Sequence, residues 1–210
     1  MKRFALIGGG GFSKEVAEVI ALNGDDVVGY FGTEEGELNR PYWGVMENML
    51  QFQDRFDAIA LAFGSVDRKS AENRGRVVDW ITKQGFSAPP IVSPHAIRAA
   101  GVTIADGVFV AHGVVISVDA EVGAFSILNS AAIVGHDAIV GCNVVVAPGA
   151  FLGGRVQVGN DSLLGPGTLT LEGRIIGASV IVGVGATVAR NIPDGATVMP
   201  IRARVLKSNR

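Results

Sequence analysis

The C-terminal half of the sequence repeats with a period of six residues. Every sixth position from 104 to 188 is aliphatic, with Thr170 as the one exception, and the run contains no insertion. The residue that follows is Ala, Ser, Gly or Asn in fourteen of the fifteen hexads. A period of six matches neither an α-helix nor an ordinary strand, and it is typical of hexapeptide β-helix repeats. The positions are Ile104, Val110, Ile116, Val122, Leu128, Val134, Val140, Val146, Leu152, Val158, Leu164, Thr170, Ile176, Val182 and Val188.

The period also predicts the geometry of the repeat. Each hexad forms one flat face with its aliphatic residue pointing inward, and small residues turn the corner, where Gly tolerates unusual backbone angles. Three faces close a triangular coil of about eighteen residues, and successive coils are about 4.8 Å apart, the spacing of neighbouring strands. The 85 residues of 104–188 therefore predict about 4.7 coils.

Composition agrees with such a solenoid and excludes several other classes. A mean hydropathy of +0.37 with 18% charged residues is too apolar for a disordered chain. The uncharged stretches 138–154 and 175–189 are broken by Gly and are shorter than the roughly 20 apolar residues of a membrane helix. A net charge of −2 gives no electrostatic reason to expect nucleic acid binding. The single cysteine, Cys142, allows no internal disulfide and predicts a reducing, cytoplasmic location.

Residues 1–84 have a different character, because they hold 23 of the 38 charges whereas residues 104–188 hold 8. Apolar runs at 4–7, 27–31 and 58–63 predict buried strands. Helical patterns lie between or after them, one with Ser13 as its N-cap and one from Asp67 to about 84. This βαβαβα order predicts a small parallel α/β sheet. Three prolines near residue 90 mark the joint, so we expect two domains, 1–88 and 89–210.

A run of four glycines, from Gly8 to Gly11, lies between the first strand and the first helix of this sheet. Backbone N–H groups at such a turn and the helix dipole favour an anion, so the turn is a candidate phosphate cradle. Gly-rich turns without a ligand also exist, so the turn alone does not establish a function.

Three histidines are candidates for acid–base chemistry. We expect His95 to be structural and His112 to be a solvated corner residue of the repeat. His136 also stands at a hexad corner, but Asp137 follows it directly. Imidazole titrates near neutral pH, and a neighbouring carboxylate could hold one tautomer and stabilise the imidazolium. Gly154 lies eighteen residues further on, so it should be one coil from His136, where its N–H could bind an oxyanion; a plain corner glycine is the alternative.

The order of these features resembles the sialic-acid O-acetyltransferase (NeuD-like) family, which includes PglD-like bacterial N-acetyltransferases acting on nucleotide-linked 4-amino sugars. The resemblance spans nearly the whole chain. It rests on the Gly-rich head, Ser93-Pro94-His95-Ala96, the hexads with Asn129-Ser130 and Gly135-His136-Asp137, then Asn191-Ile192-Pro193-Asp194 and a basic tail. It implies a left-handed parallel β-helix, acetyl-CoA as donor, and a homotrimer with active sites between neighbouring β-helices. A prism this apolar would in any case benefit from burying a flat face.

The resemblance also implies roles for individual residues. His136 would be the general base, with Asp137 polarising it and Gly154 binding the oxyanion. The site for acetyl-CoA would further include Gly153, Asn129, Gly165, Gly183 and Ala186. The nucleotide sugar would be bound by Gly8, Gly10, Gly11, Phe12, Ser13, Gly64, Ser65 and Arg68. We expect no metal ion.

The head departs from the family pattern at several positions. Phe12 stands where the family's turn has His, and Ser13 where it has Gly. The second strand ends at Gly32 without the usual acidic pair, and Val145 aligns with a second active-site His of some members. These departures leave the residues for acetyl transfer in place and affect the acceptor site, so the nucleotide and the sugar stay open.

The sequence therefore predicts an acetyl-CoA-dependent N-acetyltransferase for a nucleotide-linked amino sugar of the 4-amino-4,6-dideoxy type, in bacterial surface glycan or glycoprotein synthesis. Transfer would be direct, because Cys142 has no partner base and is not expected to be a nucleophile. One alternative is O-acetylation of a sugar hydroxyl, as in sialic acid. Another, of a different class, is a non-catalytic β-helix scaffold or sugar-binding subunit. No nucleic acid and no membrane span are expected.

Overall fold

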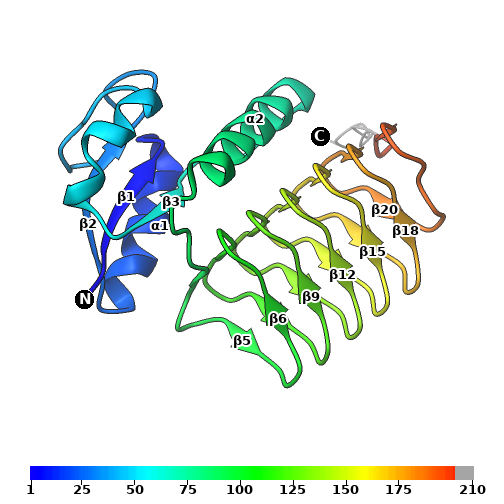
Figure 1. The fold of residues 1–210 in the computed structure, drawn as a ribbon. Helices are drawn as coiled ribbons and strands as arrows, with labels where there is room; N and C mark the ends of the chain where they lie inside the picture. Colours follow the sequence, from blue (N-terminus) through cyan, green and yellow to red (C-terminus); the bar gives the residue numbers. More distant parts are fainter. Residues whose placement is uncertain (202–210) are drawn as a thin grey trace, which may run out of the picture.

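The structure, a computed structural model, describes residues 1–201 and has two parts, a small α/β head and a long β-solenoid (Figure 1). The basic tail that the sequence analysis singled out lies outside the described residues. The head contains β1 (Arg3–Ile7), α1 (Gly11–Leu22), β2 (Asp26–Phe31), the 3-10 helices η1 (Met46–Gln51) and η2 (Gln53–Arg55), β3 (Ala58–Leu61) and α2 (Arg68–Gln84). Its three strands form a parallel sheet in the order β2-β1-β3. The predicted α/β head is confirmed, with 3-10 turns rather than an α-helix between β2 and β3.

The start of α1 differs from the prediction. The helix begins at Gly11 with Gly10 as its N-cap, so Ser13 is not the capping residue. Instead the buried hydroxyl of Ser13 donates to the carbonyl of Gly10, 2.6 Å away. In contrast, α2 has a capping box, in which the side chain of Asp67 accepts from the N–H of Ser70 and the hydroxyl of Ser70 accepts from the N–H of Asp67.

The solenoid is a stack of coils whose strands form three parallel sheets, which we call the covered, apolar and polar faces. The covered face contains β4 (Ile91–Val92), β7 (Phe109–Val110), β10 (Ile127–Leu128), β13 (Val145–Val146), β16 (Leu163–Leu164), β19 (Ile181–Val182) and β21 (Thr197–Val198). The apolar face contains β5 (Ile97–Arg98), β8 (Val115–Ile116), β11 (Ile133–Val134), β14 (Phe151–Leu152), β17 (Leu169–Thr170) and β20 (Thr187–Val188). The polar face contains β6 (Thr103–Ile104), β9 (Glu121–Val122), β12 (Ile139–Val140), β15 (Gln157–Val158) and β18 (Ile175–Ile176).

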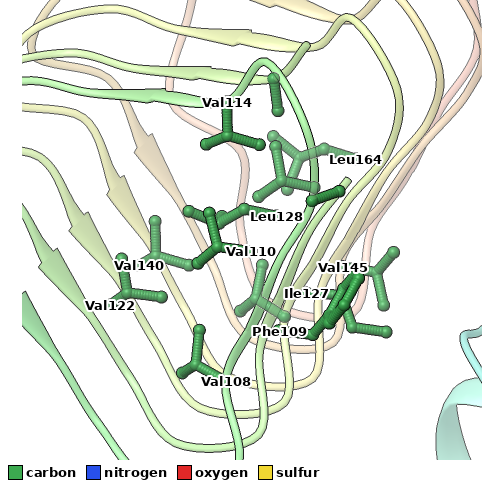
Figure 2. Close-up of a cluster of buried hydrophobic side chains, with 14 of the residues drawn as sticks. Val108, Phe109, Val110, Val114, Val122, Ile127, Leu128, Val140, Val145 and Leu164 are labelled. Atoms are coloured by element: carbon green, nitrogen blue, oxygen red, sulfur yellow. The ribbon is translucent and has the colours of Figure 1, made fainter. Parts of the chain in front are cut away.

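The register confirms the predicted six-residue period. Paired residues of neighbouring coils up to β20 are eighteen apart, as in Leu128 opposite Val146, and the inward residues of the hexads stack in the core (Figure 2). The last pair, Ile181 opposite Thr197, is sixteen apart. Thr170, the one polar member of the series, is fully buried. Its hydroxyl donates to the carbonyl of Phe151 and accepts from the N–H of Gly153, so no polar group is left unpaired. The stack begins at Ile91, before the first predicted hexad, and therefore has more coils than the predicted 4.7.

The three faces differ in their outward residues. On the covered face those from Ile91 to Leu163 are buried, and Figure 2 shows Phe109, Ile127 and Val145 pointing away from the solenoid interior. On the apolar face Ile133, Phe151 and Leu169 are exposed and uncharged, whereas on the polar face Glu121 and Gln157 interrupt the apolar residues.

The faces meet at three edges. The first edge joins the covered face to the apolar face, at residues 111–114, 129–132, 147–150, 165–168 and 183–186. The second edge joins the apolar face to the polar face, at residues 117–120, 135–138, 153–156 and 171–174. The third edge joins the polar face back to the covered face, at residues 123–126, 141–144, 159–162 and 177–180, and α2 runs alongside it (Figure 1).

Candidate functional site

The second edge holds the histidine and aspartate that the sequence singled out. Nδ1 of His136 lies 2.7 Å from Oδ2 of Asp137, and both side chains are about half exposed. Asp137 has a φ of 56°, in the left-handed region that the corner requires and that Asp tolerates better than most residues. A carboxylate can only accept, so Nδ1 carries the proton when the imidazole is neutral, and the lone pair of Nε2 is free.

Gly154 lies against the ring of His136, as the eighteen-residue spacing predicts. A Cβ built on Gly154 would be 2.4 Å from Nε2 of His136, so any larger residue would displace the imidazole. No acceptor is found within residues 1–201 for the N–H of Gly154, which leaves it available to a ligand. The N–H of Glu172, one coil further, is also free, so the adjacent imidazole is what distinguishes Gly154.

The other residues predicted to bind acetyl-CoA divide between two edges. Gly153 lies beside Gly154, whereas Asn129, Gly165, Gly183 and Ala186 lie on the first edge. Gly165 is buried, and a side chain there would meet the carbonyl of Val182 at 2.8 Å. The whole apolar face separates these two groups within one chain, so the structure does not bring them together in a single copy.

In the head, the Gly-rich turn presents free backbone donors to solvent. A Cβ on Gly10 or Gly11 would meet nothing within 4 Å, and their N–H groups have no acceptor within residues 1–201. The loop after β2 closes over the other side of the turn, where the N–H of Glu37 donates to the carbonyl of Gly9 at 2.7 Å. Lys14 pairs with Glu37 at 2.6 Å, and this hydrogen bond lowers the pKa of the Glu37 carboxyl.

Phe12 and Gly8, which are also predicted to bind the nucleotide sugar, pack against neighbouring parts of the protein. Phe12 packs edge-on against Phe109 of the covered face, with ring centroids 5.3 Å apart, so it joins the head to the solenoid. Gly8 has a φ of 112°, and a Cβ on it would meet the carbonyl of Ala62 at 2.9 Å, which brings the turn next to the segment that leads to Gly64 and the buried Ser65.

Arg68 is directed elsewhere. Its guanidinium donates to the carbonyls of Ser179 and Gly195 on the solenoid, at 3.2 and 2.9 Å. The structure therefore does not bring this side chain to the Gly-rich turn, and Arg68 anchors α2 to the third edge. Val145, which aligns with a second active-site His of some relatives, is buried on the covered face and lies away from His136.

The expectation that His112 is a solvated corner residue holds only in part, because it stands on the first edge with its side chain 37% exposed but also has partners for both ring nitrogens. Its Nδ1 lies 2.6 Å from the hydroxyl of Ser93, and its Nε2 lies 3.6 Å from Glu18 of α1. That hydroxyl also accepts from the backbone N–H of His95, whose side chain is exposed, so a structural role for the His95 imidazole stays a prediction. No sequence signal predicts the contact of His112 with α1, because this contact depends on how the head packs on the first coils.

The head and His136 lie on opposite sides of the solenoid. The head packs on the covered face, whereas His136 stands at the one edge that this face does not border. Within residues 1–201, no group of three or more His, Cys, Asp or Glu side chains is arranged to hold a metal ion. In the same part of the chain, every helix is too short or too polar to cross a bilayer.

Comparisons with known proteins agree with this architecture. Residues 3–73 match the family model of the PglD N-terminal domain, and a search of curated proteins found no match. Among solved structures, the chain is similar to a histidine-to-asparagine mutant of perosamine N-acetyltransferase from Caulobacter crescentus, in complex with CoA and GDP-perosamine. The TM-score is 0.86, the identity is 27%, and the match covers 99% of this chain and 98% of that chain.

The chain is equally similar to the acetyltransferase domain of PglB from Neisseria gonorrhoeae, with a TM-score of 0.86, 28% identity and coverage of 98% of this chain and 100% of that one. That domain has also been solved with acetyl coenzyme A. WeeI from Acinetobacter baumannii shares the fold at 24% identity. These findings confirm both the predicted resemblance and the predicted fold, a small α/β domain followed by a left-handed parallel β-helix.

Proposed function

We infer that this chain, a PglD-like left-handed β-helix acetyltransferase by its fold and its N-terminal domain, transfers an acetyl group from acetyl-CoA to the amino group of a nucleotide-linked sugar. The single observation that carries the inference is the second edge, where the His136–Asp137 pair lies against Gly154 and its free N–H. The relatives with CoA, acetyl-CoA and GDP-perosamine support the same class of donor and acceptor.

In this proposal His136 is the general base. Its Nδ1 donates to Asp137, so Nε2 accepts a proton from the amine as the nitrogen attacks the thioester carbonyl. The new C–N bond forms, and the oxygen of the tetrahedral intermediate takes up negative charge beside the N–H of Gly154. The C–S bond then breaks, and the imidazolium returns its proton to the leaving thiolate of CoA. No acyl-enzyme is needed, since Cys142 stands on the third edge, away from His136.

The acceptor would bind in the head. The free N–H groups of Gly10 and Gly11 and the dipole of α1 suit a diphosphate, and Phe12, Ser13, Gly64 and Ser65 surround that turn. A 4-amino-4,6-dideoxy sugar on such a carrier is the substrate class we propose, in the synthesis of a bacterial surface glycan or glycoprotein in the cytoplasm.

The active site would then need more than one copy of the chain. A sugar held by the head lies on the covered-face side, so it cannot reach His136 of the same copy on the opposite edge. If the exposed apolar faces of three copies meet around a common axis, the first edge of one copy approaches the second edge of the next. That arrangement brings Asn129, Gly165, Gly183 and Ala186 of one chain toward Gly153 and His136 of its neighbour, and it favours the proposed homotrimer.

The test is turnover of acetyl-CoA with a panel of acceptors. We expect release of CoA with GDP-, UDP- or dTDP-linked 4-amino sugars, and a fall of about 10²–10⁴-fold in kcat for His136→Ala with CoA binding retained. Asp137→Asn, which removes the carboxylate beside Nδ1 of His136, should also lower kcat. Asp119→Asn is its matched control and should leave kcat unchanged, because Asp119 occupies the equivalent corner one coil earlier with a φ of 58°. Undiminished turnover in His136→Ala would contradict the mechanism.

The same panel separates the other functions. Preferential transfer to free sialic acid would identify an O-acetyltransferase. A well-formed trimer that binds nucleotide sugars and releases no CoA with any acceptor would identify a non-catalytic sugar-binding subunit.

A further inference from the structure

Arg74 is a buried cation that the proposed chemistry does not use. It lies in the middle of α2 with 1% of its surface exposed, and it is among the largest fully buried side chains of the protein. Desolvation lowers its pKa to about 10, although the nearby Asp161 acts in the opposite direction, so the guanidinium stays charged at neutral pH. Charged side chains are almost never fully buried unless they are paired, so its contacts call for an explanation.

The guanidinium bridges the head and the third edge of the β-helix. Its Nε donates to the carbonyl of Phe63 at 3.1 Å, just after β3, and its Nη1 donates to the side-chain oxygen of Asn143. The amide of Asn143 donates in turn to Asp161, one coil further, at 2.7 Å. Arg74 and Asn143 are therefore both buried, at 1% and 6% exposed, whereas Asp161 at the far end of the path is exposed.

The Phe63 end of this path reaches the candidate acceptor site. Phe63 directly precedes Gly64 and Ser65, and a Cβ on Gly8 would lie 3.4 Å from the Cβ of Phe63. A shift of the Phe63 backbone would therefore move the wall against which the Gly-rich turn rests. The other end rests on corners of the same rigid coils that carry His136.

Stability alone gives little reason for this arrangement. Burial of a charged group is costly, and the two groups that Arg74 bonds directly, the carbonyl of Phe63 and the amide of Asn143, are both uncharged. A planar guanidinium with two directed bonds, however, fixes a distance and an angle between its partners, which apolar packing does not. The arrangement is suited to alignment of the head relative to the β-helix.

We propose that Arg74 and Asn143 form a positioning relay, which holds the acceptor loop at Phe63–Ser65 and the adjoining Gly-rich turn at a set place relative to the β-helix. The inference rests on the proposed function, in that it assigns the acceptor to the head and the acetyl donor to the edges of the β-helix. Loss of the relay should therefore weaken acceptor binding and leave the binding of acetyl-CoA unaffected.

The first experiment compares Arg74→Met with Arg76→Met, the matched control two residues along α2, whose side chain is exposed. The probes are GDP-perosamine and a UDP-linked 4-amino-4,6-dideoxy sugar, with Kd measured by calorimetry and KM by CoA release. In Arg74→Met we expect Kd and KM for the sugar to rise about tenfold and KM for acetyl-CoA to change less than about twofold, as expected when hydrogen bonds made through a charged group are lost. Arg76→Met should match the wild type.

A purely structural role would give a different result. Arg74→Met would then lower the melting temperature and the active fraction, and with it kcat, while both KM values stayed unchanged; that outcome would overturn the proposal. Arg74→Lys keeps the charge and can reach only one of the two acceptors at a time, so it should recover part of the acceptor affinity.

Asn143→Gly tests the other end and serves if Arg74→Met does not fold. Asn143 has a φ of 56°, which Gly adopts without strain, so this change removes the amide and spares the backbone. It should raise Kd for the sugar, and the double variant should be no worse than Arg74→Met alone, because the two residues act in one path. Additive effects, or no change in Kd, would overturn the relay.

A wild-type protein that binds the sugars and transfers no acetyl group would instead contradict the proposed function. The comparison of Kd values between the variants would still test the relay in that case.

Discussion

The head and the β-helix contribute to the proposed reaction in different ways, and they are specified differently by the sequence. The β-helix repeats one interaction, an inward aliphatic residue stacked on its counterpart eighteen residues away, so every corner position follows from the period. The head is attached by contacts that each occur once, such as Phe12 on Phe109 and Arg74 on Asn143. The repeated part thus carries the proposed base at a position that can be counted, whereas the acceptor site depends on how single contacts set the head.

The difference also extends to what covers each face of the solenoid. The outward residues of the covered face are buried from Ile91 to Leu163, whereas those of the apolar face, which are also mostly hydrophobic, have no cover within the described chain. The polar face is interrupted by Glu121 and Gln157. The chain therefore supplies a cover for one apolar face and leaves the other exposed, and this second face is the one that the proposed trimer would bury.

The largest effect is expected when the apolar face is charged. Phe151 is 39% exposed on β14, and Phe151→Asp places a carboxylate in the proposed trimer contact, where burial of an unpaired charge is strongly unfavourable. We expect loss of the trimer and a fall in turnover of about 10²-fold or more, because His136 would no longer meet the acceptor of a neighbour. Analytical ultracentrifugation and CoA release measure the two effects.

A matched variant on the polar face makes that result specific. Ile139 is 43% exposed on β12, so Ile139→Asp introduces the same charge at a similarly exposed strand position of the polar face. Ile139→Asp should leave the mass of the oligomer and the turnover of acetyl-CoA unchanged. Dissociation of the trimer by Ile139→Asp but not by Phe151→Asp would show that the polar face, and not the apolar face, forms the contact between copies.

The next effect concerns the corner that carries the base. In Gly154→Ala the new methyl group would lie 2.4 Å from Nε2 of His136, and the imidazole can rotate away, so the coil should keep its fold. A displaced base should lower kcat by about 10–100-fold, since a misplacement of about 1 Å can cost that much. Steady-state kinetics with a melting curve would show this, and full activity with an unchanged melting temperature would remove Gly154 and His136 from the mechanism.

The same contrast explains what could be predicted from the sequence. The solenoid, its inward residues and the contact of His136 with Gly154 follow from the period, because a uniform repeat fixes which residues lie one coil apart. The prediction that Ser13 is an N-cap is wrong because the four glycines allow α1 to begin earlier, at Gly11. The contact of His112 with Glu18, the direction of Arg68 and the burial of Arg74 could not be predicted, since each depends on the docking of the head, for which the sequence has no repeat.

The smallest effect is expected in the head, and it uses a glycine that differs from Gly154 in its surroundings. A Cβ on Gly11 would meet nothing within 4 Å, and Gly11 is the first residue of α1, where Ala is the better helix former by about 1 kcal/mol at most. Gly11→Ala should therefore leave the melting temperature unchanged or slightly higher. If a diphosphate approaches the free N–H groups of the turn, the methyl group would obstruct it and raise KM for the nucleotide sugar by about three- to tenfold, with kcat and KM for acetyl-CoA unchanged.

Gly154→Ala and Gly11→Ala would then separate the two regions, because Gly154→Ala would lower kcat and Gly11→Ala would raise KM for the acceptor. An unchanged acceptor KM in Gly11→Ala would move the acceptor away from this turn, while the assignment of the base to the β-helix would still stand on the Gly154 result.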